Sequence, residues 1–291
     1  MSKVLLKQIN NQYVKAIPIP DEDKRPIKGY DICEEVYANI FLCARKKSGK
    51  TSALFKIMKE CSVKKTIIIV FCSTCYKDNN WIQIRKYFEK KKMDIRVYTS
   101  IYENGEDQLS NLIENLKKEA QDKEEEDNNS DESIDNCDEI LNFLTNNVKN
   151  KSESKEHKND KKERKCKYQA PEYMIIFDDL SSELKSRSLL SLLKFNRHFK
   201  SKLIISSQWL HDLLPESRKQ IDLFLIFKGF SEDKIALFYK DCDSSIPFQN
   251  FYQIYKKATQ KPYSFLYIDS RSDSFRSNFN QQFFIKDENN Y

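Results

Sequence analysis

A basic loop near the start of the chain contains the residue types that bind phosphate. Residues 37–52 read YANIFLCARKKSGKTS, an apolar run that breaks into the loop and is followed by the helical pattern LFKIMKE. The loop matches the phosphate-loop pattern G-x-x-x-x-G-K-[ST], except that Ala44 stands where the first glycine is expected. Gly49 lets the backbone approach phosphate oxygens, and inward-pointing amides at the start of a helix bind anions. We therefore predict a nucleotide site formed by Ala44, Arg45, Lys46, Lys47, Ser48, Gly49, Lys50, Thr51 and Ser52.

Two residues of this loop have the side chains that triphosphate chemistry requires. Lys50 is placed to reach the β- and γ-phosphates of ATP, and the Thr51 hydroxyl is placed to bind Mg²⁺. A Gly-Lys-Thr sequence alone is common, and a loop rich in lysine and serine can arise by chance. The position of this loop between an apolar strand and a helix favours the nucleotide site.

Two adjacent carboxylates stand at the end of a second apolar run, far along the chain. Residues 173–180 read YMIIFDDL, which is typical of a strand buried on both faces of a parallel sheet. Ligands of such sheets lie at the carboxyl ends of the strands. We expect Asp178 to hold Mg²⁺ and Asp179 to orient or deprotonate the attacking water, because hydrolysis of a γ-phosphate requires both tasks. Such a pair can also form a turn or a helix cap, but the phosphate loop favours the catalytic interpretation.

Two further polar residues follow the carboxylates. Gln208 ends the strand-like run LIISSQ. If that strand lies between the two strands above, Gln208 faces the γ-phosphate and can sense hydrolysis; otherwise it is an ordinary hydrogen-bonding residue at a strand end. Arg218 lies shortly before the apolar run 222–227, and we expect it at the phosphate edge of the sheet, where it could act in trans on the nucleotide of a neighbouring subunit. The alternative for Arg218 is a surface arginine in a loop.

Strand-like and helix-like runs alternate along the chain. This order, with continuously apolar strands, predicts an α/β fold with a mostly parallel, doubly wound sheet flanked by helices. The predicted strands are about 38–43, 66–72, 95–99, 173–178, 202–207, 222–227 and, near the sheet edge, 263–270. The predicted helices are about 50–60, 80–91, 107–119, 185–197 and 231–240.

One stretch interrupts this alternation. Acidic residues dominate 119–139 and basic residues dominate 149–167. A segment this polar cannot bury enough apolar surface to offset the entropy lost on ordering. We therefore predict a charged, disordered or loosely helical insertion, which separates the phosphate loop from the two carboxylates.

Composition limits the class of protein. The 291 residues include 19 Phe and 15 Tyr, enough for a sizeable core, and the formal net charge of +6 permits contact with a polyanion without requiring it. The eight Cys have no disulfide-framework spacing, and no secretory signal or membrane span is visible. We expect an intracellular protein with free thiols and no membrane contact.

The order of these motifs resembles one family. The runs ARKKSGKTS, IIIVFCSTCYKDNNW, YMIIFDDLSS, LIISSQWLHDLLPESRKQIDLFLIFKGF and SDSFRSNF are similar to those of the genome-packaging ATPases of virophages, Polinton/Maverick elements and large DNA viruses, which belong to the FtsK–HerA superfamily. The resemblance implies a RecA-like P-loop NTPase fold of the additional-strand catalytic-glutamate type. It also implies an ATP- and Mg²⁺-dependent pump for double-stranded DNA, working as a homo-oligomeric ring (a pentamer or hexamer) on a capsid or portal-like vertex protein. Such a protein would act in the host cytoplasm or nucleus, in a viral factory, or in association with the virion.

The resemblance covers about 30–120 and 170–280, and it gives no role to the insertion. With the composition, it suggests the following division of the chain: an N-terminal segment 1–30, the ATPase domain in two parts 31–118 and 169–280, the insertion 119–168 and a C-terminal tail 281–291.

Three other functions remain open from the sequence. A HerA-like translocase or helicase would act in DNA processing rather than packaging. A P-loop kinase usually has an arginine-rich lid, whereas Asp178, Asp179 and Gln208 favour activation of water. A nucleotide-gated scaffold would bind ATP with little turnover.

Overall fold

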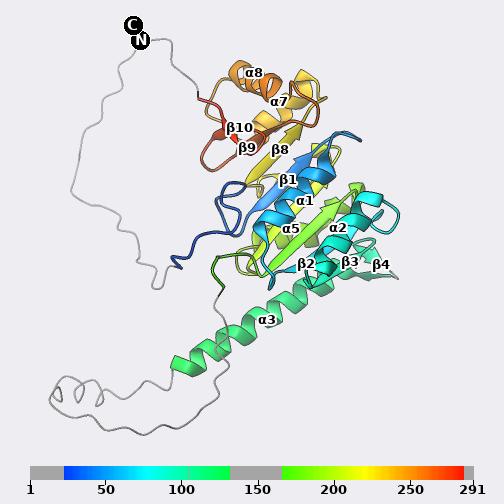
Figure 1. Ribbon diagram of the computed structural model, residues 1–291, viewed down its shortest axis with the longest axis vertical. Helices are drawn as coiled ribbons and strands as arrows, with labels where there is room; N and C mark the ends of the chain where they lie inside the picture. Colours follow the sequence, from blue (N-terminus) through cyan, green and yellow to red (C-terminus); the bar gives the residue numbers. More distant parts are fainter. Residues whose placement is uncertain (1–22, 104, 132–165, 285–291) are drawn as a thin grey trace, which may run out of the picture.

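The computed structural model describes residues 23–103, 105–131 and 166–284, and for 123–131 the backbone alone. Within these ranges the chain forms a nine-stranded sheet with helices on both faces (Figure 1). The strand order is β11-β10-β9-β8-β1-β7-β6-β2-β3. The strands are β1 (Asn39–Cys43), β2 (Ile67–Cys72), β3 (Ile95–Tyr98), β6 (Tyr173–Asp178), β7 (Ser201–Ser207), β8 (Leu223–Phe227), β9 (Phe265–Asp269), β10 (Ser274–Ser277) and β11 (Gln281–Gln282).

Six of these strands are parallel and the last three are antiparallel. β7 pairs in parallel with both β1 and β6, and β8 pairs in parallel with β1 on the other side. β9, β10 and β11 then extend the sheet in antiparallel order beyond β8. The predicted mostly parallel α/β sheet is therefore confirmed. The strand expected at 263–270 is present as β9, but it does not lie at the edge, because β10 and β11 follow it.

The helices divide between the two faces of the sheet. Side chains of α1 (Lys50–Cys61) and α2 (Asn79–Lys90) pack with one set of strand residues. Side chains of α3 (Gln108–Asp131), α5 (Arg187–Lys194), α7 (Glu232–Asp241) and α8 (Phe248–Ala258) pack with the other set. The short elements are β4 (Tyr102–Glu103), β5 (Glu106–Asp107), α6 (Pro215–Arg218) and the 3-10 turns Ser181–Lys185 and Leu210–Asp212.

Alternation along the strands explains why both faces are covered. In β1, Phe41 and Cys43 face one cluster, while Ile40 and Leu42 face the other, and all four are buried. Because successive strand residues point to opposite faces, a run of apolar residues requires helices on both sides. The sequence pattern did not reveal α8, which is rich in aromatic residues.

The helix α3 extends away from the body of the domain (Figure 1). Among the α3 residues whose side chains are described, the buried ones all precede Glu119, and they pack against the face that α5 also covers. The first part of the predicted insertion, up to Asp131, is helical. Residues 132–165 of the insertion, the first 22 residues and residues 285–291 lie outside the described part of the chain.

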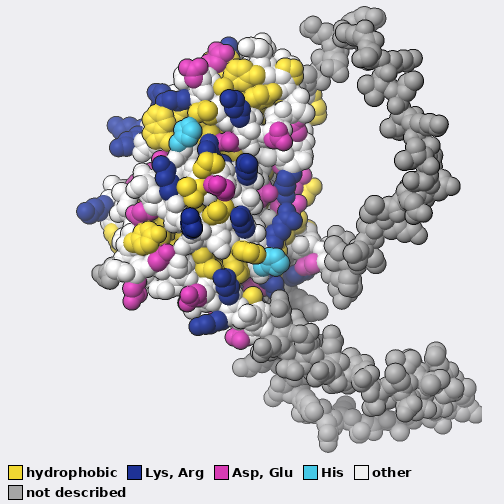
Figure 2. Space-filling view, turned by 180° about the vertical axis from the view of Figure 1, so that it is seen from behind, with side chains coloured by type: hydrophobic (Ala, Val, Ile, Leu, Met, Phe, Trp, Pro, Cys, Tyr) yellow, Lys and Arg dark blue, Asp and Glu magenta, His cyan; other side chains and the backbone are white. Residues whose placement is uncertain are grey.

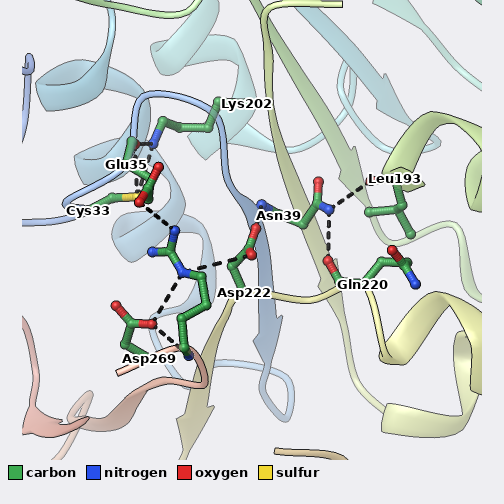
Figure 3. A network of polar contacts seen from close by, with 9 residues as sticks. Cys33, Glu35, Asn39, Leu193, Lys202, Gln220, Asp222 and Asp269 are labelled. Atoms are coloured by element: carbon green, nitrogen blue, oxygen red, sulfur yellow. Dashed lines mark hydrogen bonds and ion pairs between the residues drawn. The ribbon is translucent and has the colours of Figure 1, made fainter. Parts of the chain in front are cut away.

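A polar network fixes the start of the central strand β1 (Figure 3). The Asn39 side chain donates hydrogen bonds to the carbonyl oxygens of Leu193 (3.0 Å) and Gln220 (2.7 Å), and its backbone N–H donates to Asp222 Oδ2 (2.8 Å). Arg271 forms an ion pair with Glu35 at 2.9 Å. This network lies at the amino-terminal ends of the parallel strands, opposite the phosphate loop.

A lysine is buried in the same network. Lys202 of β7 is 1% exposed, and its Nζ donates to Glu35 O at 2.7 Å and to Cys33 Sγ at 3.0 Å. These contacts satisfy a charge that would otherwise be costly to bury. They tie the segment before β1 to the strand that separates β1 from β6.

Among the described residues, no helix is long and apolar enough to cross a membrane.

Candidate functional site

The phosphate loop connects the buried end of β1 to the first turn of α1. Two of its residues, Lys47 and Gly49, have positive φ angles of 62° and 91°. Gly49 is the residue before α1, and a Cβ at this position would lie 3.3 Å from the Tyr263 side chain, so a larger residue would be both strained and crowded. No side chain caps α1 and its first turn has no acidic residue. Its amino-terminal N–H groups are therefore available to an anion.

Ala44 replaces a glycine of the phosphate-loop pattern without strain. The φ angle of Ala44 is not positive, and the residue is fully buried. Its N–H donates to Ser207 O at 3.0 Å, which continues the pairing of β1 with β7. A position with this backbone accepts alanine as readily as glycine.

One cavity of about 330 Å³ brings most of the predicted site together. All nine predicted loop residues line it, together with Asp179 and Gln208. Two further residues, Asp78 and Asn80 at the start of α2, also line it and were not predicted. Asp78 is the residue before α2, and its side chain accepts a hydrogen bond from the Asn80 N–H at 2.7 Å.

Lys50 links the loop to both carboxylates. Its Nζ lies 3.0 Å from Asp178 Oδ1 and 2.6 Å from Asp179 Oδ1. Burial alone would lower the pKa of Lys50, but the two carboxylates outweigh burial and raise that pKa. Lys50 therefore keeps its positive charge at the point where phosphate groups would bind.

The two carboxylates differ in exposure. Asp178 ends β6 and is 1% exposed, whereas the Asp179 side chain is 38% exposed and its backbone has φ of 53°. Aspartate tolerates this left-handed conformation better than most residues. The turn directs the second carboxylate into the cavity while the first stays beneath it.

Trp81 holds the buried carboxylate from the far side. The indole Nε1–H of Trp81, a fully buried residue of α2, donates to Asp178 Oδ2 at 2.8 Å. Asp178 Oδ1 has only the ion pair with Lys50. Sequence reasoning missed Trp81; the available signal was a tryptophan in the first turn of the helix that follows the neighbouring strand β2.

These residues fit a magnesium ion. One oxygen of Asp178 accepts a hydrogen bond from the Trp81 indole, the other faces Lys50 of the loop, and Thr51, the residue after Lys50, lines the cavity. A carboxylate and a hydroxyl are oxygen ligands of the kind Mg²⁺ takes beside phosphate groups. The described residues contain no cluster of three or more acidic, histidine or cysteine ligands, and Mg²⁺ usually completes its shell with water and phosphate oxygens.

Gln208 follows the strand β7, which lies between β1 and β6, and this strand order is the condition on which the predicted sensor role of Gln208 depends. Gln208 lines the phosphate cavity together with Asp179, and both residues lie at the same edge of the sheet. The location is suitable for contact with a γ-phosphate, and the role stays a prediction.

Arg218 does not lie at the phosphate edge, and this expectation was wrong. Arg218 precedes β8, which is parallel to β1, so the residues before it lie at the amino-terminal edge of the sheet. Its Nη1 forms an ion pair with Asp241 Oδ2 at 2.9 Å, at the end of α7. Arg218 is not among the residues lining the phosphate cavity of its own chain, which leaves action on a neighbouring subunit as its predicted catalytic role.

Comparisons with known proteins agree with this architecture. No family model and no curated protein matches the sequence. Among solved structures, the genome packaging NTPase B204 from Sulfolobus turreted icosahedral virus 2, in complex with AMP, matches 87% of this chain and 100% of its own, with a TM-score of 0.50 and 16% identity. The chain has the fold of a viral genome-packaging NTPase.

Two other matches are weaker. The same NTPase in complex with ATP-gammaS gives a TM-score of 0.47 at 18% identity, covering 83% of this chain and 96% of the other. The cytoplasmic domain of the type VII secretion ATPase EccC from Thermomonospora curvata gives a TM-score of 0.39 at 10% identity. This match covers 79% of this chain and 24% of the EccC chain.

The contact between Trp81 and Asp178 gives a first prediction. Trp81→Phe should lower the free energy of unfolding by about 1–3 kcal/mol beyond its packing loss, because a buried carboxylate oxygen loses its donor. Denaturant unfolding measures the change, with Trp209→Phe at the other, half-exposed tryptophan as the matched control. Repeating Trp81→Phe in an Asp178→Ala background isolates the hydrogen bond. Equal losses in both backgrounds would show that the indole only fills space.

Proposed function

We propose that this protein is an ATP-hydrolysing motor that moves double-stranded DNA and packages a viral or virus-like transposon genome into a capsid. One observation supports hydrolysis above all. Lys50 of the phosphate loop lies within ion-pair distance of both Asp178 and Asp179, although β7, the strand that Gln208 follows, stands between β1 and β6. The likeness of the fold to a packaging NTPase supports the motor and its task.

The chemistry divides between the two carboxylates. Thr51 and Asp178 would hold Mg²⁺, which when bound supplies positive charge to the β- and γ-phosphate oxygens. Asp178 is buried, hydrogen-bonded to Trp81 and not among the residues lining the cavity, so it is not placed to meet an attacking water. Asp179 is the more exposed carboxylate and lines the cavity, and we assign it the role of general base, with Gln208 orienting the water.

The ion pair of Lys50 with Asp179 links binding to catalysis. Asp179 Oδ1 is paired with Lys50 Nζ at 2.6 Å. A triphosphate in the loop competes for the same ammonium group. A nucleotide that draws Lys50 towards its phosphates would therefore free the Asp179 carboxylate to contact the attacking water.

Double-stranded DNA is the proposed polymer. The formal net charge is +6, and Lys and Arg side chains are spread over the face in Figure 2 among acidic and hydrophobic ones. The charge permits sequence-independent contact with phosphate backbones.

We propose a homo-oligomeric ring of five or six subunits, docked on a capsid or portal-like vertex protein inside the host cell. In each subunit, 31–118 and 169–280 would form the ATPase domain.

The proposal is tested by ATP hydrolysis with and without duplex DNA. We expect phosphate release that depends on Mg²⁺ and rises several-fold on addition of duplex DNA, and no release in Lys50→Ala. Transfer of phosphate to a small acceptor would indicate a kinase, and tight ATP binding without turnover would indicate a scaffold. Stimulation by single-stranded DNA alone would contradict a packaging motor.

Replacement of the proposed base should separate binding from hydrolysis. Asp179→Asn keeps the side-chain volume but cannot take a proton, so turnover should fall by about 10²–10⁴-fold while ATP binding persists. Single-turnover hydrolysis and calorimetric titration measure the two quantities. Asp78→Asn, a change of the same kind in another residue of the cavity, is the matched control. A wild-type rate in Asp179→Asn would remove Asp179 from the chemistry.

Arg218 gives a test of the ring. Arg218→Ala should bind ATP but hydrolyse it poorly, because the arginine would stabilise charge in the site of a neighbour. Mixing Arg218→Ala with Lys50→Ala subunits should restore part of the activity in rings shown to exchange subunits, since one subunit supplies the loop and the other the guanidinium.

Asp241→Asn provides the control for that experiment, because it breaks the ion pair but keeps the arginine. Equal loss of turnover in Arg218→Ala and Asp241→Asn, without rescue on mixing, would show that Arg218 acts through the ion pair alone.

A further inference from the structure

The phosphate cavity has no aromatic side chain that could contact a nucleobase. Its lining is polar or charged apart from Ala44 and the glycine, and it contains no aromatic side chain. A base is a flat apolar ring system that proteins bind by contact with apolar and aromatic side chains. The base of a nucleotide held by this loop must therefore lie outside the cavity.

A second cavity begins where the phosphate cavity ends. It has a volume of about 320 Å³ and lies between the first turns of α1 and the exposed side of α2. The two cavities share Thr51, Ser52 and Asn80. We call it the α1–α2 cavity; its remaining lining residues are Phe55, Gln83, Ile84 and Tyr87.

The shared residues lie on the correct side for a nucleoside. Lys50, Asp179 and Gln208 mark the γ-phosphate end of the phosphate cavity. In a phosphate loop the amides towards the helix surround the α- and β-phosphates. The nucleoside therefore leaves past Ser52, which opens into the α1–α2 cavity.

The apolar wall of this cavity is rigid. Phe55 and Tyr87 are partly buried and meet edge-to-face, with ring centroids 5.2 Å apart. Both rings also contact the buried Phe88, at 6.1 and 5.1 Å. A wall fixed in this way loses little side-chain entropy when a flat ligand binds.

Two side-chain amides provide polar recognition. Asn80 and Gln83 are exposed on α2, and no hydrogen bond to either side-chain amide is found among the described residues. An amide presents one donor and one acceptor side by side, the pairing that proteins use for N6 and N7 of adenine. Guanine presents two acceptors there, which arginine or lysine matches, and the α1–α2 cavity is lined by neither.

We infer that the α1–α2 cavity binds the adenine base, with Gln83 hydrogen-bonding to its edge and Phe55 and Tyr87 contacting its rings. The inference rests on the proposed function, because it takes the phosphate loop as a nucleotide site. One other aromatic ring lies beside the loop. Tyr263 is 71% exposed and approaches Gly49, but it lines neither cavity.

The test compares three ligands by calorimetric titration: ATP, GTP and inorganic tripolyphosphate. Gln83→Ala and Tyr87→Ala should each weaken ATP binding by about 5–10-fold, the effect of one lost hydrogen bond or ring contact. Gln83→Ala should also reduce the preference for ATP over GTP. Tripolyphosphate should bind all variants alike, and Tyr102→Ala, which removes an exposed ring on β4, is the control.

Different failures have different meanings. Unchanged ATP affinity in both variants would overturn the inference while leaving the phosphate site intact, and so would a loss of ATP binding confined to Tyr263→Ala. If the wild-type protein binds neither ATP nor tripolyphosphate, the proposed function falls and the inference falls with it. Gln83 is exposed, so Gln83→Ala decides the matter even if Tyr87→Ala fails to fold.

Discussion

The contact of one lysine with two adjacent carboxylates is the interaction around which this site is arranged. Asp178 is almost completely buried, and a buried charge is tolerated only when it is paired and hydrogen-bonded. Lys50 supplies the opposite charge and Trp81 supplies the hydrogen bond. These two residues belong to α1 and α2, so a single carboxylate fixes the phosphate loop and the neighbouring helix relative to β6.

This arrangement requires a particular sheet order. β7 lies between β1 and β6, so Lys50 must reach past the end of an intervening strand, and the residue that follows that strand, Gln208, lines the same cavity. At the other edge, Asn39 bonds to segments on both sides of β1, and the buried Lys202 ties β7 to the chain before β1. The strands are thus held in register at one end while their loops carry the chemistry at the other.

Local sequence was sufficient for the strands and for the loop. Continuous apolar runs such as 173–178 can be stable only inside a covered sheet, and polar residues at their ends must then face a common edge. This reasoning placed Asp179 and Gln208 beside the phosphate loop. It could not find Trp81, Asp78 or Asn80, because their contacts depend on how α2 packs across the sheet, and an exposed amide or a buried tryptophan has no distinctive pattern in sequence. Arg218 was misplaced because β8 runs parallel to β1, and residues before a parallel strand lie at the edge opposite the ligand.

The central claim is that Asp178 holds Mg²⁺ while Asp179 acts as the general base. The Mg²⁺ dependence of nucleotide binding tests this claim most directly. ATPγS affinity is measured by titration at increasing Mg²⁺ concentration in the wild-type protein, Asp178→Asn and Asp179→Asn. The account predicts that Mg²⁺ strengthens binding in the wild-type protein and in Asp179→Asn, and that this gain is lost in Asp178→Asn. Loss of the gain in Asp179→Asn, with Asp178→Asn behaving like the wild-type protein, would contradict the account and reverse the two roles.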